Sequence, residues 1–157
     1  MQSYRHAQHA GDHAPRGRIL LVEADPDAAL FVTFVLGQRG GFKVIHTADP
    51  VVALALAATE PWDLVLAAAD LPVLSGIELL ADLRKLTPDL PVAILASSTL
   101  DASYTATVSS CRPDAVLAKP VKAVTLLATA SALAVSGRTG NDRSSLPASG
   151  DSPPPGL

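Results

Sequence analysis

The chain is poor in cysteine, because Cys111 is the only one among 157 residues. A single cysteine excludes an intrachain disulfide, which agrees with a protein of the reducing cytosol. Export and membrane signals are also missing: residues 1–13 contain no long apolar run, and the apolar stretch 121–135 contains Lys122 and is too short to span a bilayer. We therefore expect a soluble, cytoplasmic protein that does not contact a membrane.

Aromatic residues are scarce at 4%, whereas 48% of the residues are hydrophobic and 17% are charged. These proportions are typical of a globular domain whose core consists mostly of Ala, Val and Leu. Basic residues are few as well, since residues 19–137 contain seven Lys and Arg against twelve Asp and Glu, a net charge of −5. An acidic domain of this kind does not favour nucleic acid as a partner.

Regular hydrophobic patterning is absent from both ends of the chain. Residues 1–17 are polar and interrupted by glycine and proline, which predicts a flexible arm. Residues 138–157 are rich in Pro, Gly and Ser and have too little apolar surface to fold alone, which predicts a disordered tail. One folded domain is thus predicted over residues 18–137.

Within this domain, short aliphatic runs alternate with helical patterns. The predicted strands are 19–22, 42–46, 63–67, 92–95 and 115–118, and the predicted helices are 26–39, 50–59, 76–86, 101–110 and 121–135. Asp25-Pro26 and Asp49-Pro50 are typical helix starts, with an acidic N-cap and a proline in the first turn. Ser75 is the predicted N-cap of the third helix.

The strand runs are continuously apolar rather than alternating, which is typical of strands covered on both faces. Five such strands alternating with five helices predict an α/β fold, a three-layer sandwich with a parallel sheet at its centre. Because crossovers are right-handed, a flavodoxin-like strand order of 2-1-3-4-5 is the commonest arrangement. Chemistry is then expected where the strands end, at the carboxyl edge of the sheet.

Three segments together resemble the receiver domain of two-component response regulators, over residues 18–136. They are residues 19–27 (ILLVEADPD), 63–80 (DLVLAAADLPVLSGIELL) and 117–120 (LAKP). Their order and spacing carry the resemblance, since each segment alone is a weak signal. The resemblance implies a (βα)5 fold and a place in phosphorelay signal transduction.

Receivers hold Mg²⁺ with an acidic pair after the first strand and with the phosphate-accepting aspartate of the third. By resemblance, Glu23 takes the first acidic position, but Ala24 takes the second and Ala68 takes the acceptor position. Phosphoryl transfer needs a nucleophile and a charge-neutralising metal. Alanine supplies neither a nucleophilic oxygen nor a metal ligand. The resemblance therefore implies a vestigial pocket without a bound metal or cofactor.

The resemblance identifies four further positions of this pocket. Ala96, next to Ser97, stands where the family has a hydroxyl side chain after the fourth strand, and Val116 stands where many receivers have Tyr or Phe. The active-site lysine is retained as Lys119. Its peptide bond to Pro120 is expected to be cis, an arrangement largely confined to X–Pro bonds.

Two alternatives stay open at this pocket. Asp70, two residues beyond Ala68, offers a displaced phosphate acceptor, although misplacement of a nucleophile is costly for in-line chemistry. Glu23 and Asp25 offer weak Mg²⁺ binding. We favour instead an ion pair between Lys119 and one of these two carboxylates.

The first and last predicted helices are unusually apolar. Thr33 is the only polar residue between positions 28 and 36, and a helix that is apolar all round is covered on more than one side. In the predicted strand order these two helices lie side by side. We expect an apolar outer surface that docks a partner or a second copy, or that stays bare, around Leu30, Phe34, Thr125 and Thr129.

These expectations describe a stand-alone, degenerate response-regulator receiver, a pseudo-receiver that is not an enzyme. It acts by protein–protein interaction with a histidine kinase, another regulator or itself. The alternative is a phosphate-accepting single-domain response regulator that uses Asp70 or a hydroxyl group. A flavodoxin-like ligand binder is disfavoured, because no glycine-rich phosphate loop follows the first strand.

Overall fold

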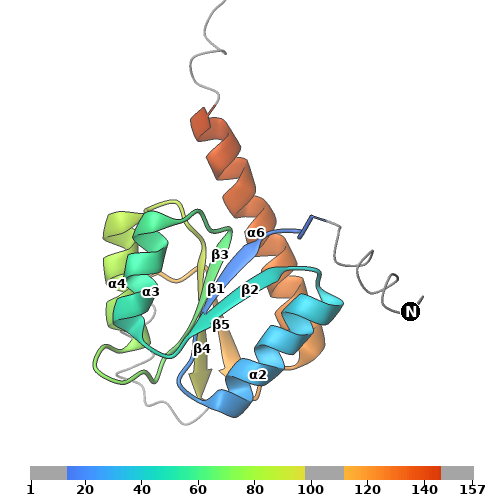
Figure 1. Cartoon of the computed structure of the whole chain (residues 1–157), viewed down its shortest axis with the longest axis vertical. Coiled ribbons are helices and arrows are strands. Elements are labelled where there is room, and N and C mark those ends of the chain that lie inside the picture. The colour runs from blue at the N-terminus through green and yellow to red at the C-terminus, as the bar shows by residue number, and fades with distance from the viewer. Residues whose placement is uncertain (1–13, 98–111, 146–157) are drawn as a thin grey trace, which may run out of the picture.

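A parallel sheet between two layers of helices forms the centre of the computed structural model (Figure 1). The structure describes residues 14–97 and 112–145, with side chains described as far as Val135. The predicted helix 101–110 lies outside the described residues, as do residues 1–13 of the predicted arm and 146–157 of the predicted tail.

The sheet has the predicted strand order β2-β1-β3-β4-β5, and every neighbouring pair is parallel. The strands are β1 (Arg18–Val22), β2 (Lys43–Thr47), β3 (Leu64–Ala68), β4 (Val92–Ser97) and β5 (Ala115–Lys119). In the register of the sheet, Val22 lies opposite Thr47 on one side and Ala67 on the other. Ser97 lies opposite Lys119, so the strand ends meet at one edge.

The helices of the described residues cover the two faces of the sheet in pairs. They are α2 (Pro26–Phe34), α3 (Pro50–Thr59), α4 (Gly76–Leu86) and α6 (Ala123–Ser145). One core cluster joins α2 and α6 to the sheet through residues such as Val32 and Leu126, and the other joins α3 and α4 through residues such as Ala53 and Leu80. The predicted side-by-side placement of the first and last helices is confirmed (Figure 1).

Burial explains why the central strands read as continuous apolar runs. All side chains from Ile19 to Val22 and from Leu64 to Ala68 are fully buried. The two edge strands differ, since β2 is largely half-exposed and Val116 of β5 is 49% exposed. The prediction of burial on both faces therefore holds for the three central strands only.

The predicted helix starts are confirmed by side-chain caps. Asp25 accepts a hydrogen bond from the Asp27 amide at 3.0 Å, and Asp49 accepts one from the Val51 amide at 2.8 Å. Ser75 forms a reciprocal capping box with Glu78 at the start of α4.

Two helix boundaries differ from the predictions. The helix predicted over 26–39 is regular only to Phe34 and continues as a π-helical turn (Val35–Arg39). The helix predicted over 121–135 begins at Ala123 and continues through Gly137 to Ser145. Glycine in a helix costs about 1 kcal/mol but does not end the helix by itself. The predicted tail thus begins within α6, which extends beyond the sheet (Figure 1).

Candidate functional site

Glu23 follows directly after β1 and is the one charged side chain buried in the described core, with 1% exposure. Its amide donates a hydrogen bond to the Thr47 carbonyl at 3.1 Å, and its own carbonyl lies 2.8 Å from Nε2 of His46. Its Oε1 accepts a hydrogen bond from the Asp25 amide at 2.9 Å. Contacts of its main chain with β2 and of its carboxylate with the Asp25 amide therefore hold Glu23 at the carboxyl edge of the sheet.

Lys119, the last residue of β5, forms the predicted ion pair. The sequence did not decide whether its partner is Glu23 or Asp25. The Nζ of Lys119 lies 2.6 Å from Oε2 of Glu23, so the partner is Glu23 rather than Asp25. No hydrogen-bond donor of the described residues reaches this oxygen with good geometry, and Lys119 is its only close counter-charge among them. A buried carboxylate is costly without such a partner, so the two charges depend on each other.

Asp25 does not join this ion pair. Its side chain caps α2, and both Asp25 and the preceding Ala24 are exposed. Asp27, in the first turn of α2, is also exposed. The acidic residues after β1 are thus divided between one buried carboxylate and two at the surface.

Ala68 ends β3, and its side chain is fully buried. The start of α4 packs directly on this strand end, because the Gly76 amide donates to the Ala69 carbonyl at 3.0 Å. A Cβ at position 76 would lie 2.2 Å from the Ala68 carbonyl oxygen, so only glycine permits this approach. The structure therefore encloses the alanines at the end of β3 rather than opening them to solvent.

The other predicted pocket residues lie around this edge with different exposure. Ala96 is 6% exposed at the end of β4, and Ser97 beside it is partly buried. Val116 is half-exposed on β5, farther from the edge than Lys119. The peptide bond from Lys119 to Pro120 is cis, as predicted.

Asp70 lies in the connection between β3 and α4 and is exposed. Within the described part of the chain, no hydrogen bond or ion pair ties its carboxylate to Glu23 or Lys119. Of the predicted site residues, the structure thus joins Glu23 and Lys119 directly and leaves Asp25 and Asp70 at the surface.

The side chains at this edge do not fit a magnesium ion. Mg²⁺ prefers near-octahedral oxygen ligation. Glu23 is committed to Lys119, Asp25 caps a helix, and Ala68 has no side-chain oxygen. Within residues 14–97 and 112–145, no three His, Cys, Asp or Glu side chains gather in a way that could hold a metal.

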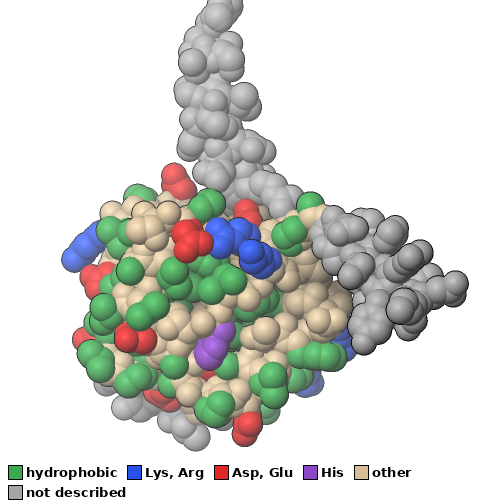
Figure 2. All heavy atoms as spheres, in the orientation of Figure 1, with side chains coloured by type: hydrophobic (Ala, Val, Ile, Leu, Met, Phe, Trp, Pro, Cys, Tyr) green, Lys and Arg blue, Asp and Glu red, His purple; other side chains and the backbone are tan. Residues whose placement is uncertain are grey.

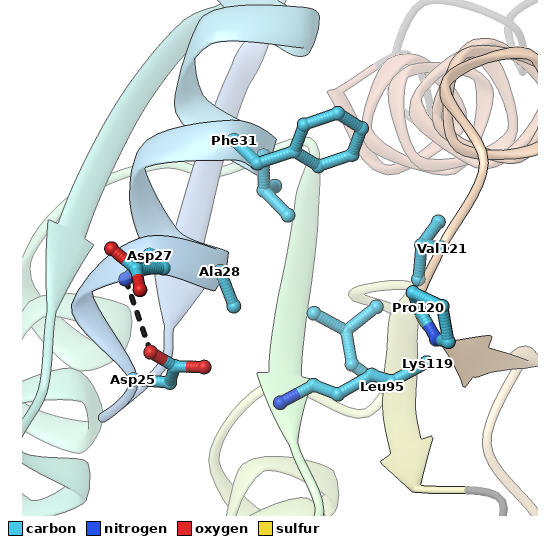
Figure 3. Close-up of a pocket in the computed structure, with 9 residues that line it drawn as sticks. Asp25, Asp27, Ala28, Phe31, Leu95, Lys119, Pro120 and Val121 are labelled. Atoms are coloured by element: carbon cyan, nitrogen blue, oxygen red, sulfur yellow. Dashed lines mark hydrogen bonds between the residues drawn. The ribbon is translucent and has the colours of Figure 1, made fainter.

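A pocket of about 460 Å³ opens next to the ion pair, between α2 and the β5–α6 connection (Figure 3). Its lining residues are Asp25, Asp27, Ala28, Phe31, Val32, Leu95, Lys119, Pro120 and Val121. The sequence did not identify Asp27, Phe31 or Val121 as site residues. The apolar α2 pattern was the only available signal, and it does not show which side of the helix faces a cavity.

The apolar surface predicted on α2 and α6 is present in part. Leu30 is 71% exposed and Phe34 is 57% exposed, and Thr125 is exposed as well. Thr129 is only partly exposed, so it contributes less than predicted. Hydrophobic side chains at the surface over α2 and α3 are visible in Figure 2.

The fold and the strand-edge residues together define a class of protein. It is a doubly wound parallel α/β domain with an acidic residue after β1 and a lysine at the end of β5. The model of the response regulator receiver domain family matches residues 19–131, and the chain belongs to this family.

Solved structures agree with the family assignment. The receiver domain of a sensor histidine kinase from Pseudomonas aeruginosa PAO1, described with a magnesium ion coordinated in its active site cleft, is 25% identical. The alignment covers 77% of this chain and 98% of that one, with a TM-score of 0.70. A Francisella response regulator receiver domain is 26% identical over 76% and 97% of the two chains, with a TM-score of 0.67.

A chemotaxis protein of Vibrio cholerae shares the fold, with 24% identity, 76% and 99% coverage and a TM-score of 0.67. A search of curated protein sequences finds no match. In the described part of the chain, no helix has the length and apolar character needed to cross a membrane.

Proposed function

We propose that this receiver domain is degenerate and signals by contact alone, without accepting a phosphoryl group. The main support is the Glu23–Lys119 ion pair at the carboxyl edge of the sheet, where Ala68 takes the place of a reactive carboxylate. Acyl-phosphate formation requires a nucleophilic oxygen, which the methyl group of alanine lacks. The remaining donors do not fit the metal that would neutralise the transferred phosphate.

In this role the protein is a non-enzymatic interaction module of a two-component pathway. The proposed partner is a histidine kinase, another response regulator or a second copy of the chain, in the cytoplasm. The acidic charge of residues 19–137 disfavours nucleic acid as the partner. The exposed Leu30 and Phe34 on α2 are the proposed centre of the contact, because exposed apolar clusters mark interaction sites.

Incubation with acetyl phosphate and Mg²⁺, followed by intact-mass measurement under mild conditions, tests the absence of phosphorylation. We expect an unchanged mass for the parent chain. A stoichiometric phosphoryl adduct on the folded protein would overturn the proposal.

The second candidate, a displaced acceptor at Asp70, is favoured only by the exposure of this carboxylate in the loop after β3. If an adduct forms, Asp70→Asn identifies its site. Loss of the adduct in this variant supports the displaced acceptor, whereas an unchanged adduct points to a hydroxyl group. Asp89→Asn, at another exposed aspartate, is the matched control.

The contact surface is tested separately by co-purification from the native cell. We expect Leu30→Ser and Phe34→Ser to reduce recovery of the bound protein. Val51→Ser, at an exposed apolar position on α3, controls for general changes in surface hydrophobicity. Equal recovery with all three variants would remove α2 from the proposed contact.

A further inference from the structure

The pocket beside α2 has an apolar floor and walls. Its lining includes Val32 and Leu95, which are almost fully buried, and Phe31, Pro120 and Val121 form its sides (Figure 3). Its volume of about 460 Å³ lies within the range of pockets that hold small ligands. Phe31 is 42% exposed, so part of its ring is available for contact with an incoming group.

Charged side chains are confined to one end of this pocket. They are Asp25, Asp27 and Lys119. The positive charge of Lys119 is already compensated by Glu23 at 2.6 Å. Neither aspartate forms an ion pair with any residue that the structure describes.

One oxygen of Asp25 is occupied, because it accepts the Asp27 amide at 3.0 Å. The other oxygen is directed toward the pocket, on the side of the Lys119 amino group (Figure 3). The pocket therefore presents an apolar interior and, at its rim, two negative charges without an ion-pair partner among the described residues.

An anionic ligand does not suit this arrangement. The N-terminus of α2 would favour an anion, but Asp25 and Asp27 already supply negative charge to that helix end. A further anion would face both carboxylates. A neutral apolar group would fill the interior and leave the two charges without a partner.

A guanidinium group on an aliphatic stem satisfies each of these features. It stacks on aromatic faces such as that of Phe31, and its planar fork pairs with carboxylates through two hydrogen bonds. Its methylene stem packs on apolar walls. A lysine ammonium lacks both the planar fork and the stacking face.

We propose that the pocket between α2 and the β5–α6 connection binds an arginine side chain of a partner protein. Leu30 and Phe34 lie exposed on the same helix as Phe31, so apolar residues are expected to flank the arginine. This inference rests on the proposed role as an interaction module and specifies the chemistry of the partner.

A pair of short peptides tests the proposal on the full chain. The first is the capped tripeptide Leu-Arg-Leu, and the second replaces arginine by citrulline, its neutral isostere. Amide chemical shifts in ¹H–¹⁵N NMR are followed during titration. We expect saturable shifts at residues 25–32 and 119–121 with the arginine peptide, and about tenfold weaker binding of the citrulline peptide.

Substitutions at the rim separate charge from shape. Asp25→Asn combined with Asp27→Asn removes both charges, while asparagine still caps α2. This double variant is expected to bind the arginine peptide about tenfold more weakly. Asp49→Asn is the matched control, since Asp49 caps α3 in the same way away from the pocket. It is expected to leave binding unchanged.

Three results would overturn the proposal: no localised shifts with the arginine peptide, equal binding of the citrulline peptide, or equal binding by the Asp25/Asp27 double variant. The acetyl phosphate experiment distinguishes this failure from failure of the proposed function. An unchanged mass together with no peptide binding rejects the pocket assignment alone, whereas a phosphoryl adduct rejects the contact-only function.

Discussion

The two ends of the parallel sheet use charge differently. At the amino end, Oδ2 of Asp63 accepts the amide of Arg18 at 2.7 Å, and Oδ2 of Asp114 accepts the amide of Val92 at 2.8 Å. Each carboxylate thus satisfies the first amide of a strand, β1 or β4. At the carboxyl end, the Glu23 carboxylate is buried, with Lys119 as its counter-charge and the amide of Asp25, in the loop after β1, as its backbone donor.

The difference indicates that charged side chains contribute to stability in different ways at the two ends. The amino-end charges are partly exposed and satisfy backbone groups that would otherwise be unpaired, at little desolvation cost. Arg18 also lies over the ring of Trp62, 4.4 Å from its centroid. A buried ion pair, in contrast, is weak evidence for stability, because desolvation offsets much of its attraction. Four substitutions test this comparison.

Gly76→Ala should cause the largest loss of stability, because the carboxyl end is packed against α4 without space for a side chain. The added Cβ would lie 2.2 Å from the Ala68 carbonyl oxygen and 2.9 Å from the Ala69 Cα. Forced displacement of packed backbone is expected to cost about 3 kcal/mol. The shift of the urea unfolding midpoint, with an unchanged dependence of the unfolding free energy on urea concentration, measures this loss of stability.

Gly37→Ala provides the control for a glycine with room around it. The methyl group of alanine at this position would have the Phe42 carbonyl oxygen as its nearest neighbour, at 3.8 Å, which is an ordinary contact. This variant should match or slightly exceed the parent stability, since alanine favours helical backbone. Equal stability of the two variants would show that α4 does not press on β3 as described.

Lys119→Met should cause the next largest loss, because it leaves the Glu23 carboxylate buried without a counter-charge. Removing one partner of a buried pair costs about 3–5 kcal/mol, and partial exposure of Lys119 reduces the expected loss to about 2–3 kcal/mol. Chemical unfolding measures the free energy. Combining it with Glu23→Gln should restore much of the loss, which a double-mutant cycle quantifies.

The exposed Arg18–Glu60 ion pair at the amino end provides the control for the loss expected from Lys119→Met. Glu60→Gln breaks the Arg18–Glu60 ion pair of 2.7 Å and should cost about 0.5 kcal/mol or less, because both side chains contact water. A loss for Lys119→Met as small as this would contradict the distinction between buried and exposed charge at the two ends.

Asp114→Ala should cause a moderate loss at the amino end, because it leaves the Val92 amide without an acceptor. Val92 is 1% exposed, so water does not readily replace the carboxylate. We expect a loss of about 1.5 kcal/mol for alanine. Asp114→Asn keeps an acceptor and loses only the Arg84 ion pair, and it should cost about 0.5 kcal/mol. Thermal and urea unfolding of both variants measure the difference, and equal losses would assign the effect to the ion pair.

The strands and helix starts could be predicted because they depend on local patterns, and the strand order could be predicted because right-handed crossovers leave few arrangements of alternating strands and helices. Apolar runs longer than three residues mark the buried strands, and Asp-Pro pairs mark the starts of α2 and α3. The end of α6 could not be predicted in this way. Glycine, here Gly137, is a frequent residue at helix ends, because it readily adopts the left-handed backbone conformation that ends a helix. It can also adopt the helical conformation, so its presence does not require the helix to end.

The site could be predicted only as far as residue identity decides its chemistry. Ala68 and Lys119 were identified from their place in the pattern. Which carboxylate meets Lys119 depends on burial, and the sequence does not distinguish Glu23 from Asp25 in that respect. The pocket was missed because its walls come from α2, β4 and the β5–α6 connection, segments that only the folded chain brings together.

Val73→Gly should have the smallest effect, and of opposite sign. Val73 is 94% exposed at the carboxyl end of the sheet, yet its φ is 68°, a conformation that is strained for a β-branched residue. Glycine removes about 1–2 kcal/mol of strain but loses more backbone entropy on folding, so a net gain of about 0.5 kcal/mol is expected.

Arg112 sharpens this prediction, because it has a φ of 54° at the amino end, just before β5. Its side chain is unbranched at Cβ, and its carbonyl accepts a hydrogen bond from Arg84 at 3.1 Å, which holds the turn in place. Arg112→Gly should therefore gain less than Val73→Gly in the same unfolding experiment. A larger gain at Val73 would show that the strain at Val73 is less well compensated by its surroundings than that at Arg112. A loss at Val73 with a gain at Arg112 would contradict this difference in strain between the two positions.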